Sequence, residues 1–262
     1  MSYDRFHEAA LRGLETGFTV ASIASSPLTT CGPDDDPEDV LKREHWKDFD
    51  AIPVKDEGRI VAVIERGTGQ KRVLDSSILV SASQPLREFL ATPGLAEDGY
   101  RLVLSGSEID GVVTPSDLLR LPVRVFAFAL LARIEPTMID VLQERNLSMG
   151  EWIPWLSERR QREIVNRERR MSANRLNPDM IEFTQFGEKV EILLKLDLIS
   201  ETTAEAAGRL TDLRNQIAHQ RGYADDKEGL RLFLKRLQQS YDFIEVLEIL
   251  AVSPDLAARE AG

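Results

Sequence analysis

A helix-strand-strand pattern that occurs twice in the first half of the chain constrains the fold more than any other feature of this sequence. Residues 51–64 contain two apolar segments around the polar turn Lys55-Asp56-Glu57-Gly58, which is typical of a β-hairpin. The pattern returns 49 residues later, in residues 100–113. Four pairs of positions align without gaps: Ile60 with Ile109, Ala62 with Gly111, Val63 with Val112, and Ile64 with Val113.

Each hairpin follows a stretch of helical character, residues 37–47 before the first and residues 84–91 before the second. A single copy of this unit leaves one apolar face of its sheet uncovered, and two copies can bury these faces against each other. We therefore predict that the first half folds as a pair of α/β repeats and that neither copy is stable alone.

The hydrophobic pattern changes to the period of an α-helix after residue 121. We expect helices over residues 123–145, 148–173, 200–219 and 227–250, and a further helix that begins at the N-cap signal Asn177-Pro178-Asp179. The chain is thus predicted to be an α+β protein, with α/β repeats in residues 1–122 and an all-helical bundle in residues 123–262.

Composition narrows the class of protein further. Hydrophobic residues make up 42% and charged residues 29% of the 262 positions, as in globular proteins with real cores. The longest apolar run, residues 125–132, is far shorter than the roughly 20 residues that cross a bilayer, and the first residues lack the apolar segment of a secretory signal. We expect a cytoplasmic protein without a membrane span. The three histidines show no metal-ligand spacing, so we expect no metal site.

The second copy ends where a buried strand runs into a helix start, at Thr114-Pro115-Ser116-Asp117. Free backbone N–H groups at a helix start attract phosphate, so Thr114 could donate a hydrogen bond to a phosphate and Asp117 could accept from ribose hydroxyls. The same spacing also describes a capping box, in which Thr114 is the N-cap and Asp117 reaches back to it. Spacing alone favours the capping box.

The two copies together resemble a tandem CBS-domain (Bateman) module over about residues 18–122. The resemblance rests on Ile52-Pro53-Val54 in the first copy and Gly111-Val112-Val113-Thr114-Pro115-Ser116-Asp117 in the second. It implies that the chain binds an adenine nucleotide, AMP, ADP or ATP, with Thr114 at the phosphate and Asp117 at the ribose. The first copy departs from the family pattern, because Glu65 stands where the Thr belongs. The resemblance therefore implies one full site per chain.

Arg214, Asn215 and His219 form a second group of polar residues near the end of the helix expected over residues 200–219. With about 100° of rotation per residue, Asn215 and His219 share one face of that helix, and Leu213 and Ile217 share the buried face. An imidazole can take a proton near neutral pH, and a guanidinium can stabilise negative charge on phosphorus. These groups are able to cleave RNA without a metal. A satisfied polar cluster that closes a helix is the simpler alternative.

The stretch Leu213-Arg214-Asn215-Gln216-Ile217-Ala218-His219 resembles the signature of the HEPN domain, an Arg, a polar residue and then a His after four to six positions. The resemblance covers about residues 123–250. It implies metal-independent ribonuclease activity that depends on Arg214, Asn215 and His219, and a dimer in which two such sets line one cleft. Some HEPN proteins are non-catalytic. One toxin branch carries a Tyr two positions after the His, where this chain has Arg221.

Seven arginines and three glutamates lie between residues 157 and 175, which gives this segment a local net charge of +4 in a chain whose net charge is -11. A basic segment of this kind could contact the phosphate backbone of RNA. A solvated helix face with Glu/Arg pairs accounts for the same pattern equally well.

These features together predict a cytoplasmic homodimer in which an adenine nucleotide, bound by residues 1–122, regulates an RNA-cleaving bundle that needs no cofactor for catalysis. The helix from Val123 would link the two halves mechanically. The apolar stretch of residues 125–131 supports the dimer. The alternative is a non-catalytic nucleotide sensor whose bundle serves dimerisation or partner binding.

Overall fold

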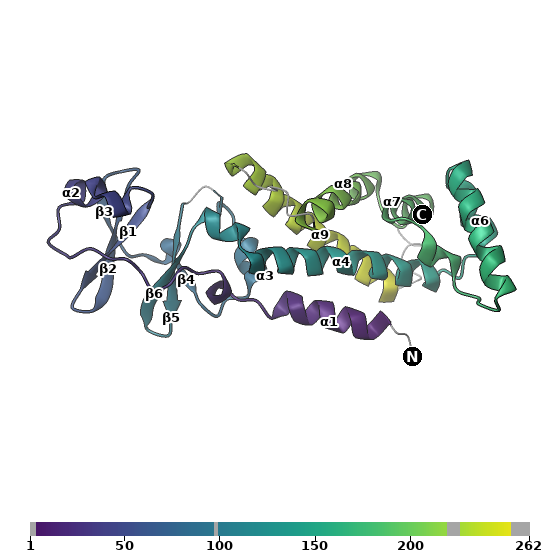
Figure 1. Cartoon of the computed structure of the whole chain (residues 1–262), viewed down its shortest axis with the longest axis horizontal. Coiled ribbons are helices and arrows are strands. Elements are labelled where there is room, and N and C mark those ends of the chain that lie inside the picture. Colours follow the sequence, from purple (N-terminus) through teal and green to yellow (C-terminus); the bar gives the residue numbers. More distant parts are fainter. Residues whose placement is uncertain (1–3, 97–98, 219–225, 253–262) are drawn as a thin grey trace, which may run out of the picture. The chain divides into compact units, whose positions relative to one another are not determined.

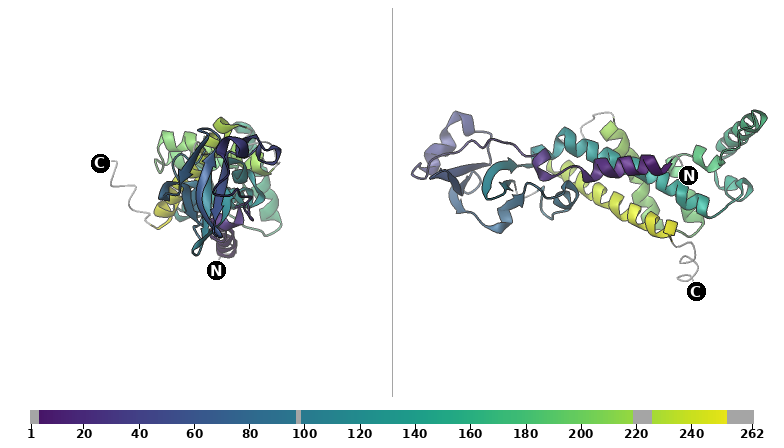
Figure 2. Two further views of the ribbon diagram at one scale, coloured as in Figure 1. Left: turned by 90° about the vertical axis from the view of Figure 1, so that its left-hand side faces the viewer. Right: turned by 90° about the horizontal axis from the view of Figure 1, so that it is seen from below.

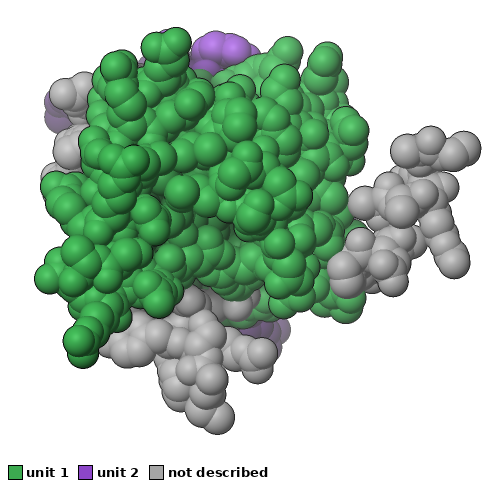
Figure 3. Space-filling model, turned by 90° about the vertical axis from the view of Figure 1, so that its right-hand side faces the viewer, with its two compact units in different colours: residues 1–12, 127–223, 235–262 green, residues 13–126, 224–234 purple. Residues whose placement is uncertain are grey.

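The computed structural model describes residues 4–96, 99–218 and 226–252. The chain divides into two compact units, which Figure 3 shows in different colours. The first, called here the sheet unit, comprises residues 13–126 and 224–234; the second, the helical unit, comprises residues 1–12, 127–223 and 235–262. The predicted α+β class is confirmed. The boundary predicted between residues 122 and 123 lies inside a helix and stays a prediction.

The sheet unit contains two small three-stranded sheets (Figure 1). The first copy has the order β1-β2-β3, with antiparallel pairing throughout, and the second has the order β4-β5-β6, in which β4 runs parallel to β5. The elements of the first copy are α2 (Pro37–Lys42), η2 (Glu44–Trp46), β1 (Ala51–Asp56), β2 (Arg59–Glu65) and β3 (Gln70–Val73). Those of the second are η3 (Ser76–Ile78), β4 (Leu79–Ser81), α3 (Leu86–Leu90), β5 (Arg101–Ser105), β6 (Glu108–Val113) and η4 (Pro115–Leu119).

The register of the two hairpins confirms the repeat. In the first, Val54 pairs with Ala62 and the register then shifts, so that Lys55 pairs with Ile60. In the second, Val103 pairs with Gly111 and Leu104 with Ile109 after the same shift. All four pairs are related by the 49-residue offset, so the irregularity in the ladder is itself repeated. Sequence reasoning missed the third strand of each sheet, because residues 70–73 and 79–81 are too short to show a period.

The segment that precedes the first copy contacts the edges of both sheets. Ser25 pairs antiparallel with Val112 of β6, and Cys31 pairs parallel with Val54 of β1. Gly111 permits this approach, because a Cβ atom at that position would lie 3.3 Å from the Cβ of Ala24. The two ends of the segment 25–31 thus each form a backbone bridge to the edge strand of one sheet.

The predicted burial of the two sheet faces against each other is confirmed. One cluster combines Ala51 and Val63 of the first copy with Ile78, Tyr100 and Leu102 of the second. A separate cluster under the first sheet contains Val40, Trp46, Ile52, Val54, Ala62 and Ile64, together with Cys31. The α2 helix is shorter than the predicted residues 37–47, since it ends at Lys42 and a 3-10 turn follows.

The helical unit is built on helices, three of which (α1, α4 and α9) also contribute residues to the sheet unit. Figures 1 and 2 show α6 standing away from α7 and α8 within this unit. None of the described helices is long and apolar enough to cross a membrane. The elements are α1 (Asp4–Thr16), α4 (Leu121–Glu144), α5 (Met149–Trp152), η5 (Ile153–Trp155), α6 (Glu158–Ala173), η6 (Met180–Phe183), α7 (Phe186–Lys195), α8 (Glu201–Ala218) and α9 (Lys227–Val252). A further 3-10 turn, η1 (Val20–Ser22), belongs to the sheet unit.

Two helix predictions in this unit were wrong in detail. The helix expected over residues 148–173 is divided into α5, η5 and α6, because Pro154 lies at the start of η5 and Ser157 caps a new helix. The N-cap expected at Asn177 is instead Asp179, whose side chain accepts from the Ile181 N–H and starts the 3-10 turn η6. The α-helix follows at Phe186, where Gln185 and Glu188 form a capping box.

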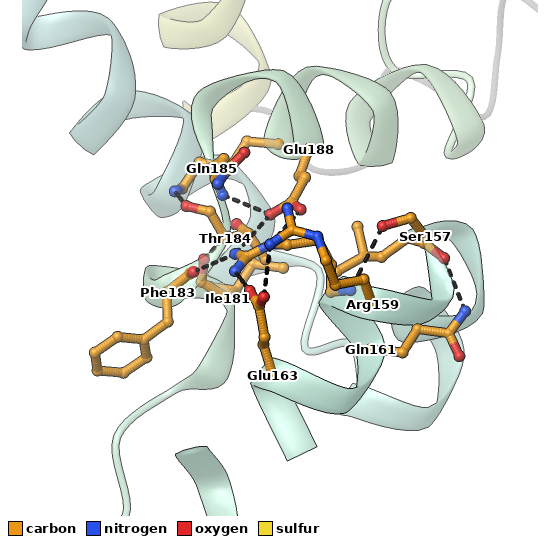
Figure 4. A network of polar contacts seen from close by, with 12 residues as sticks. Ser157, Arg159, Gln161, Glu163, Ile181, Phe183, Thr184, Gln185 and Glu188 are labelled. Carbon is orange, nitrogen blue, oxygen red and sulfur yellow. Dashed lines mark hydrogen bonds and ion pairs between the residues drawn. The ribbon is translucent and has the colours of Figure 1, made fainter. Parts of the chain in front are cut away.

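Arg160 joins α6 to the start of α7 through the polar network of Figure 4. Its Nε donates to Glu188 Oε1 at 2.7 Å, and its Nη2 donates to Glu188 Oε2 at 3.1 Å and to the Phe183 carbonyl at 3.2 Å. Glu188 also accepts from the Gln185 N–H at 2.7 Å. Burial opposes ionisation of Glu188, but Arg160 and the Gln185 N–H outweigh it and hold the pKa of this carboxyl below its ordinary value.

We predict that the Glu188 network stabilises the helical unit at neutral pH. Glu188→Gln should lower the free energy of unfolding by about 1.5–3 kcal/mol at pH 7, the range for hydrogen bonds to charged groups. A depressed pKa contributes stability above the unfolded value, here 4.5, and loses it as pH falls through the folded value. The difference from wild type, measured by urea unfolding, should therefore shrink below pH 4.5.

Glu191→Gln is the control, because Glu191 is an exposed residue of the same helix. It should change the free energy of unfolding by no more than about 0.5 kcal/mol. A Glu188→Gln difference that stays constant between pH 7 and pH 3 would contradict this account.

Candidate functional site

The junction between β6 and η4 places Thr114 and Asp117 in direct contact. Asp117 Oδ2 accepts from the Thr114 N–H at 2.7 Å and from Thr114 Oγ1 at 2.9 Å. The two residues form the capping box that the spacing favoured, with Pro115 at the first position of η4. Asp117 is buried, with 3% of its surface exposed, whereas Thr114 is half-buried.

Arg120 completes the environment of Asp117, and sequence reasoning missed it. Its Nη2 lies 2.7 Å from Asp117 Oδ1 and donates to Ser25 Oγ at 2.6 Å. Its Nη1 donates to the carbonyls of Ile23 at 2.8 Å and Ala24 at 3.2 Å. One guanidinium therefore ties residues 23–25 to the start of η4. The only sequence signal was an arginine three positions after the aspartate.

The carboxylate of Asp117 has no spare acceptor position in this arrangement. A carboxylate offers about four lone-pair sites. Thr114 occupies two of them, Arg120 a third, and Ser25 the fourth through a longer hydrogen bond of 3.3 Å from its Oγ. A further donor, such as a ribose hydroxyl, would have to replace the Ser25 hydroxyl, which makes the weakest of these contacts by distance.

The equivalent position in the first copy carries a different network. Glu65, 49 residues before Thr114, accepts from Tyr100 Oη at 2.8 Å and from Arg72 Nη1 at 3.1 Å. Burial, together with the neighbouring Glu65 carboxylate, raises the pKa of the Tyr100 phenol. Arg72 continues the network to Asp75 at 3.0 Å and to Ser77 at 2.8 Å. Side chains of both copies thus hold Glu65 Oε1 at this position, where the second copy has the Thr114 hydroxyl.

The second group of predicted site residues belongs to α8. Arg214 and Asn215 lie in its last turns, and Arg214 Nη1 pairs with Glu135 Oε2 of α4 at 3.2 Å. The side chain of Arg214 is 36% exposed, and Asn215 is exposed. His219 lies outside the described residues, so the helix face expected to be shared by Asn215 and His219 stays a prediction.

Glu135 also binds a buried lysine that sequence reasoning missed. Lys189 of α7 is fully buried, and its Nζ lies 3.1 Å from Glu135 Oε1 and donates to the Thr184 carbonyl. Burial lowers the pKa of the Lys189 ammonium, and the adjacent Glu135 carboxylate opposes that shift. Glu135 therefore connects α4 to α7 and α8 and holds the Arg214 guanidinium at a defined place.

The arginine-rich segment is largely exposed, and two of its three glutamates have partners within it. Arg159 pairs with Glu163 at 2.7 Å, while Glu168 accepts from Ser172 at 3.0 Å. Trp152, which precedes the segment, is buried with 1% of its surface exposed.

Comparison of the sequence with protein-family models and with curated proteins finds no match. Solved structures that the chain is similar to include the CBS domain of the bacterial CNNM/CorC family Mg²⁺ transporter. For that domain in complex with ATP, the identity is 13%, the match covers 47% of this chain and 96% of the other, and the TM-score is 0.35. For the domain without a named ligand, the identity is 13%, the match covers 48% of this chain and 85% of the other, and the TM-score is 0.34. For a complex with an inhibitor, the identity is 12%, the match covers 48% of this chain and 86% of the other, and the TM-score is 0.34.

We predict that Arg120 and Asp117 stabilise the sheet unit as a coupled pair. Arg120→Ala leaves the buried carboxylate without its cation, so the free energy of unfolding should fall by about 1.5–3 kcal/mol. In a double-mutant cycle measured by urea unfolding, Arg120→Ala and Asp117→Ala together should cost less than the sum of the two single changes. Arg59→Ala, at an exposed position of β2, is the control and should have an effect within about 0.5 kcal/mol. Additive losses would show that the two side chains act independently.

Proposed function

We propose that the sheet unit is a CBS-type pair that binds one adenine nucleotide per chain, at the Thr114–Asp117 junction of the second copy. The observation that carries this proposal is the asymmetry between the two copies. The second copy presents a hydroxyl and a carboxylate at the start of η4, whereas the first presents Glu65, which is held by Tyr100 and Arg72.

The chemistry of the junction suits a nucleotide for two reasons. Thr114 Oγ1, which lies 2.8 Å from Ser116 Oγ as well as near Asp117, can turn to donate to a phosphate oxygen. The Asp117 carboxylate can accept from a ribose hydroxyl if the Ser25 hydroxyl gives up its place. Arg120 keeps its ion pair in this arrangement and supplies a positive charge next to the phosphate.

We predict that nucleotide affinity depends on Asp117 and Thr114. Asp117→Ala should weaken binding of ATP, ADP or AMP at least about tenfold, because a charge-assisted hydrogen bond to the ribose is worth about 1.5–3 kcal/mol. Isothermal titration calorimetry on the full chain measures this. Asp117→Ala also removes the capping box, so a second variant is needed. Thr114→Val leaves the Asp117 carboxylate and its bond to Arg120 in place. It should lower the affinity for these nucleotides, because it removes the hydroxyl that donates to a phosphate.

Glu65→Gln is the matched control in the first copy and should leave nucleotide affinity unchanged within about twofold, since no ligand contacts Glu65 in this proposal. Thermal melting shows whether each variant is folded. No binding by the wild-type chain, or equal affinity of wild type and a folded Thr114→Val protein, would refute the site.

The second candidate function is metal-independent cleavage of RNA by the helical unit, under control of the nucleotide. The placement of Arg214 favours it. Glu135 and the buried Lys189 hold this guanidinium at one point, while a third of the side chain stays exposed and Asn215 lies exposed beside it. In this proposal His219 takes the proton from a ribose 2′-hydroxyl, whose oxygen attacks the adjacent phosphorus and displaces the 5′-oxygen. Arg214 stabilises the charge on phosphorus, Asn215 orients the imidazole, and His219 of the other chain in a homodimer protonates the leaving 5′-oxygen.

We predict that Arg214→Ala and His219→Ala each lower the rate of RNA cleavage at least about a hundredfold, because each removes a group that acts in the transition state. Cleavage of a labelled single-stranded RNA, with and without ATP, ADP or AMP, is the measurement. EDTA should leave the rate unchanged, and the DNA of the same sequence should survive because it lacks the 2′-hydroxyl.

Arg209→Ala is the control on the same helix, since Arg209 is exposed and pairs only with Glu205 among the residues described. It should cleave RNA at the wild-type rate. If wild type with every nucleotide added cuts no RNA, or if His219→Ala cuts as well as wild type, the helical unit is a dimerisation or partner-binding module of a nucleotide sensor.

A further inference from the structure

A cavity of about 400 Å³ opens at the turns of the two hairpins in the sheet unit. Repeat mates from both copies line it, including Ile60 with Ile109 and Arg59 with Glu108. Ser26, Pro27, Leu28 and Thr30, from the segment between the two bridges to the sheets, also line it. This volume lies within the range of small-molecule sites in proteins, which is about 300–1,000 Å³.

The cavity has an apolar lining at its inner side. Leu28, Ile60, Leu74, Leu104 and Ile109 contribute to it, and each of them is half-buried. Ile60, Leu74 and Ile109 also pack against the cluster between the two sheets, so this part of the lining is continuous with the core. A hydrocarbon group that entered the cavity would leave water for an apolar contact on several sides.

The charged residues of the cavity are separated by sign. Lys55 and Arg59 belong to the first hairpin, whereas Glu108 and Asp110 belong to the second. All four are exposed, and none of them forms an ion pair with any residue in the part of the chain that the structure describes. Two cations and two anions therefore line one cavity without pairing with each other, and the repeat mates Arg59 and Glu108 carry opposite charges.

We propose that this cavity binds a small zwitterion with an apolar side chain, the chemistry of an apolar α-amino acid. The carboxylate of the ligand pairs with Arg59 and Lys55, its ammonium pairs with Glu108 and Asp110, and its hydrocarbon side chain covers the apolar lining. A ligand with both charges satisfies both sides of the cavity, which no anion or cation alone does.

The zwitterion site is separate from the proposed nucleotide site. The cavity includes Glu108, at the start of β6, whereas Thr114 follows the end of that strand. Neither Thr114 nor Asp117 lines the cavity. The two sites therefore lie at opposite ends of one strand, and the two proposals can fail independently.

The test is isothermal titration calorimetry of the full chain with L-leucine, L-isoleucine, L-methionine and L-phenylalanine as separate probes. At least one of them should bind. Arg59→Gln and Glu108→Gln should each weaken binding of that amino acid at least about tenfold, because each removes one charge-assisted contact. Glu57→Gln and Arg87→Gln, at exposed positions outside the cavity, should leave its affinity unchanged.

Two leucine analogues test the requirement for both charges. 4-Methylpentanoate lacks the ammonium group and leucinamide lacks the carboxylate, so each should bind at least about tenfold more weakly than leucine. Thr114→Val should bind the amino acid as wild type does, even if it loses the nucleotide. Absence of binding by all four amino acids at about 10 mM, or equal binding of leucine and either analogue, would overturn the proposal.

Discussion

The packing of two small sheets against each other is the interaction on which the sheet unit depends. Each copy contributes residues to one shared cluster, in which Val63 and Leu102 are completely buried. Each sheet alone would leave its part of this cluster exposed to water, and the second copy covers it. Residues 25–31 strengthen the pairing, because they form bridges to both sheets. The geometry of both candidate small-molecule sites follows from this pairing.

Asp117 would serve both stability and ligand binding in the proposed site. Its four acceptor positions are occupied by Thr114, Arg120 and Ser25, which tie η4 to residues 23–25. A ligand that takes the place of the Ser25 hydroxyl would loosen the contact between this segment and η4. The 3-10 turn η4 directly precedes α4, and α4 contributes residues to both units. A loosened contact at η4 would therefore affect the start of the helix that continues into the helical unit.

The repeat could be predicted from the sequence, because positions 49 residues apart align without gaps and have equivalent places in the two hairpins. Even the register shift after Val54 and Val103 is shared by the two hairpins. The strands β3 and β4 could not be predicted, because segments of four and three residues are too short to show the two-residue hydrophobic period of a strand. The division of the helix expected over residues 148–173 could have been predicted from Pro154 and Ser157.

The candidate sites were predictable only in part. Thr114 and Asp117 were found from their spacing, and the structure brings them into contact. Arg120, Ser25 and Glu135 were missed, because their partners are distant in sequence or give no motif. The ion pair of Lys189 with Glu135 was also missed, because a lysine in a helix is normally expected to face solvent. Contacts between residues that are far apart in the sequence can be identified only once the fold is known.

The number of nucleotides bound per chain tests the central claim most directly. That claim is that the second copy binds a nucleotide at Thr114 and Asp117, whereas the first copy, in which Tyr100 and Arg72 hold Glu65, binds none. Titration of ATP into the full chain, at a protein concentration well above the dissociation constant, measures this number. The account predicts one nucleotide per chain; two nucleotides per chain, or none, would contradict it.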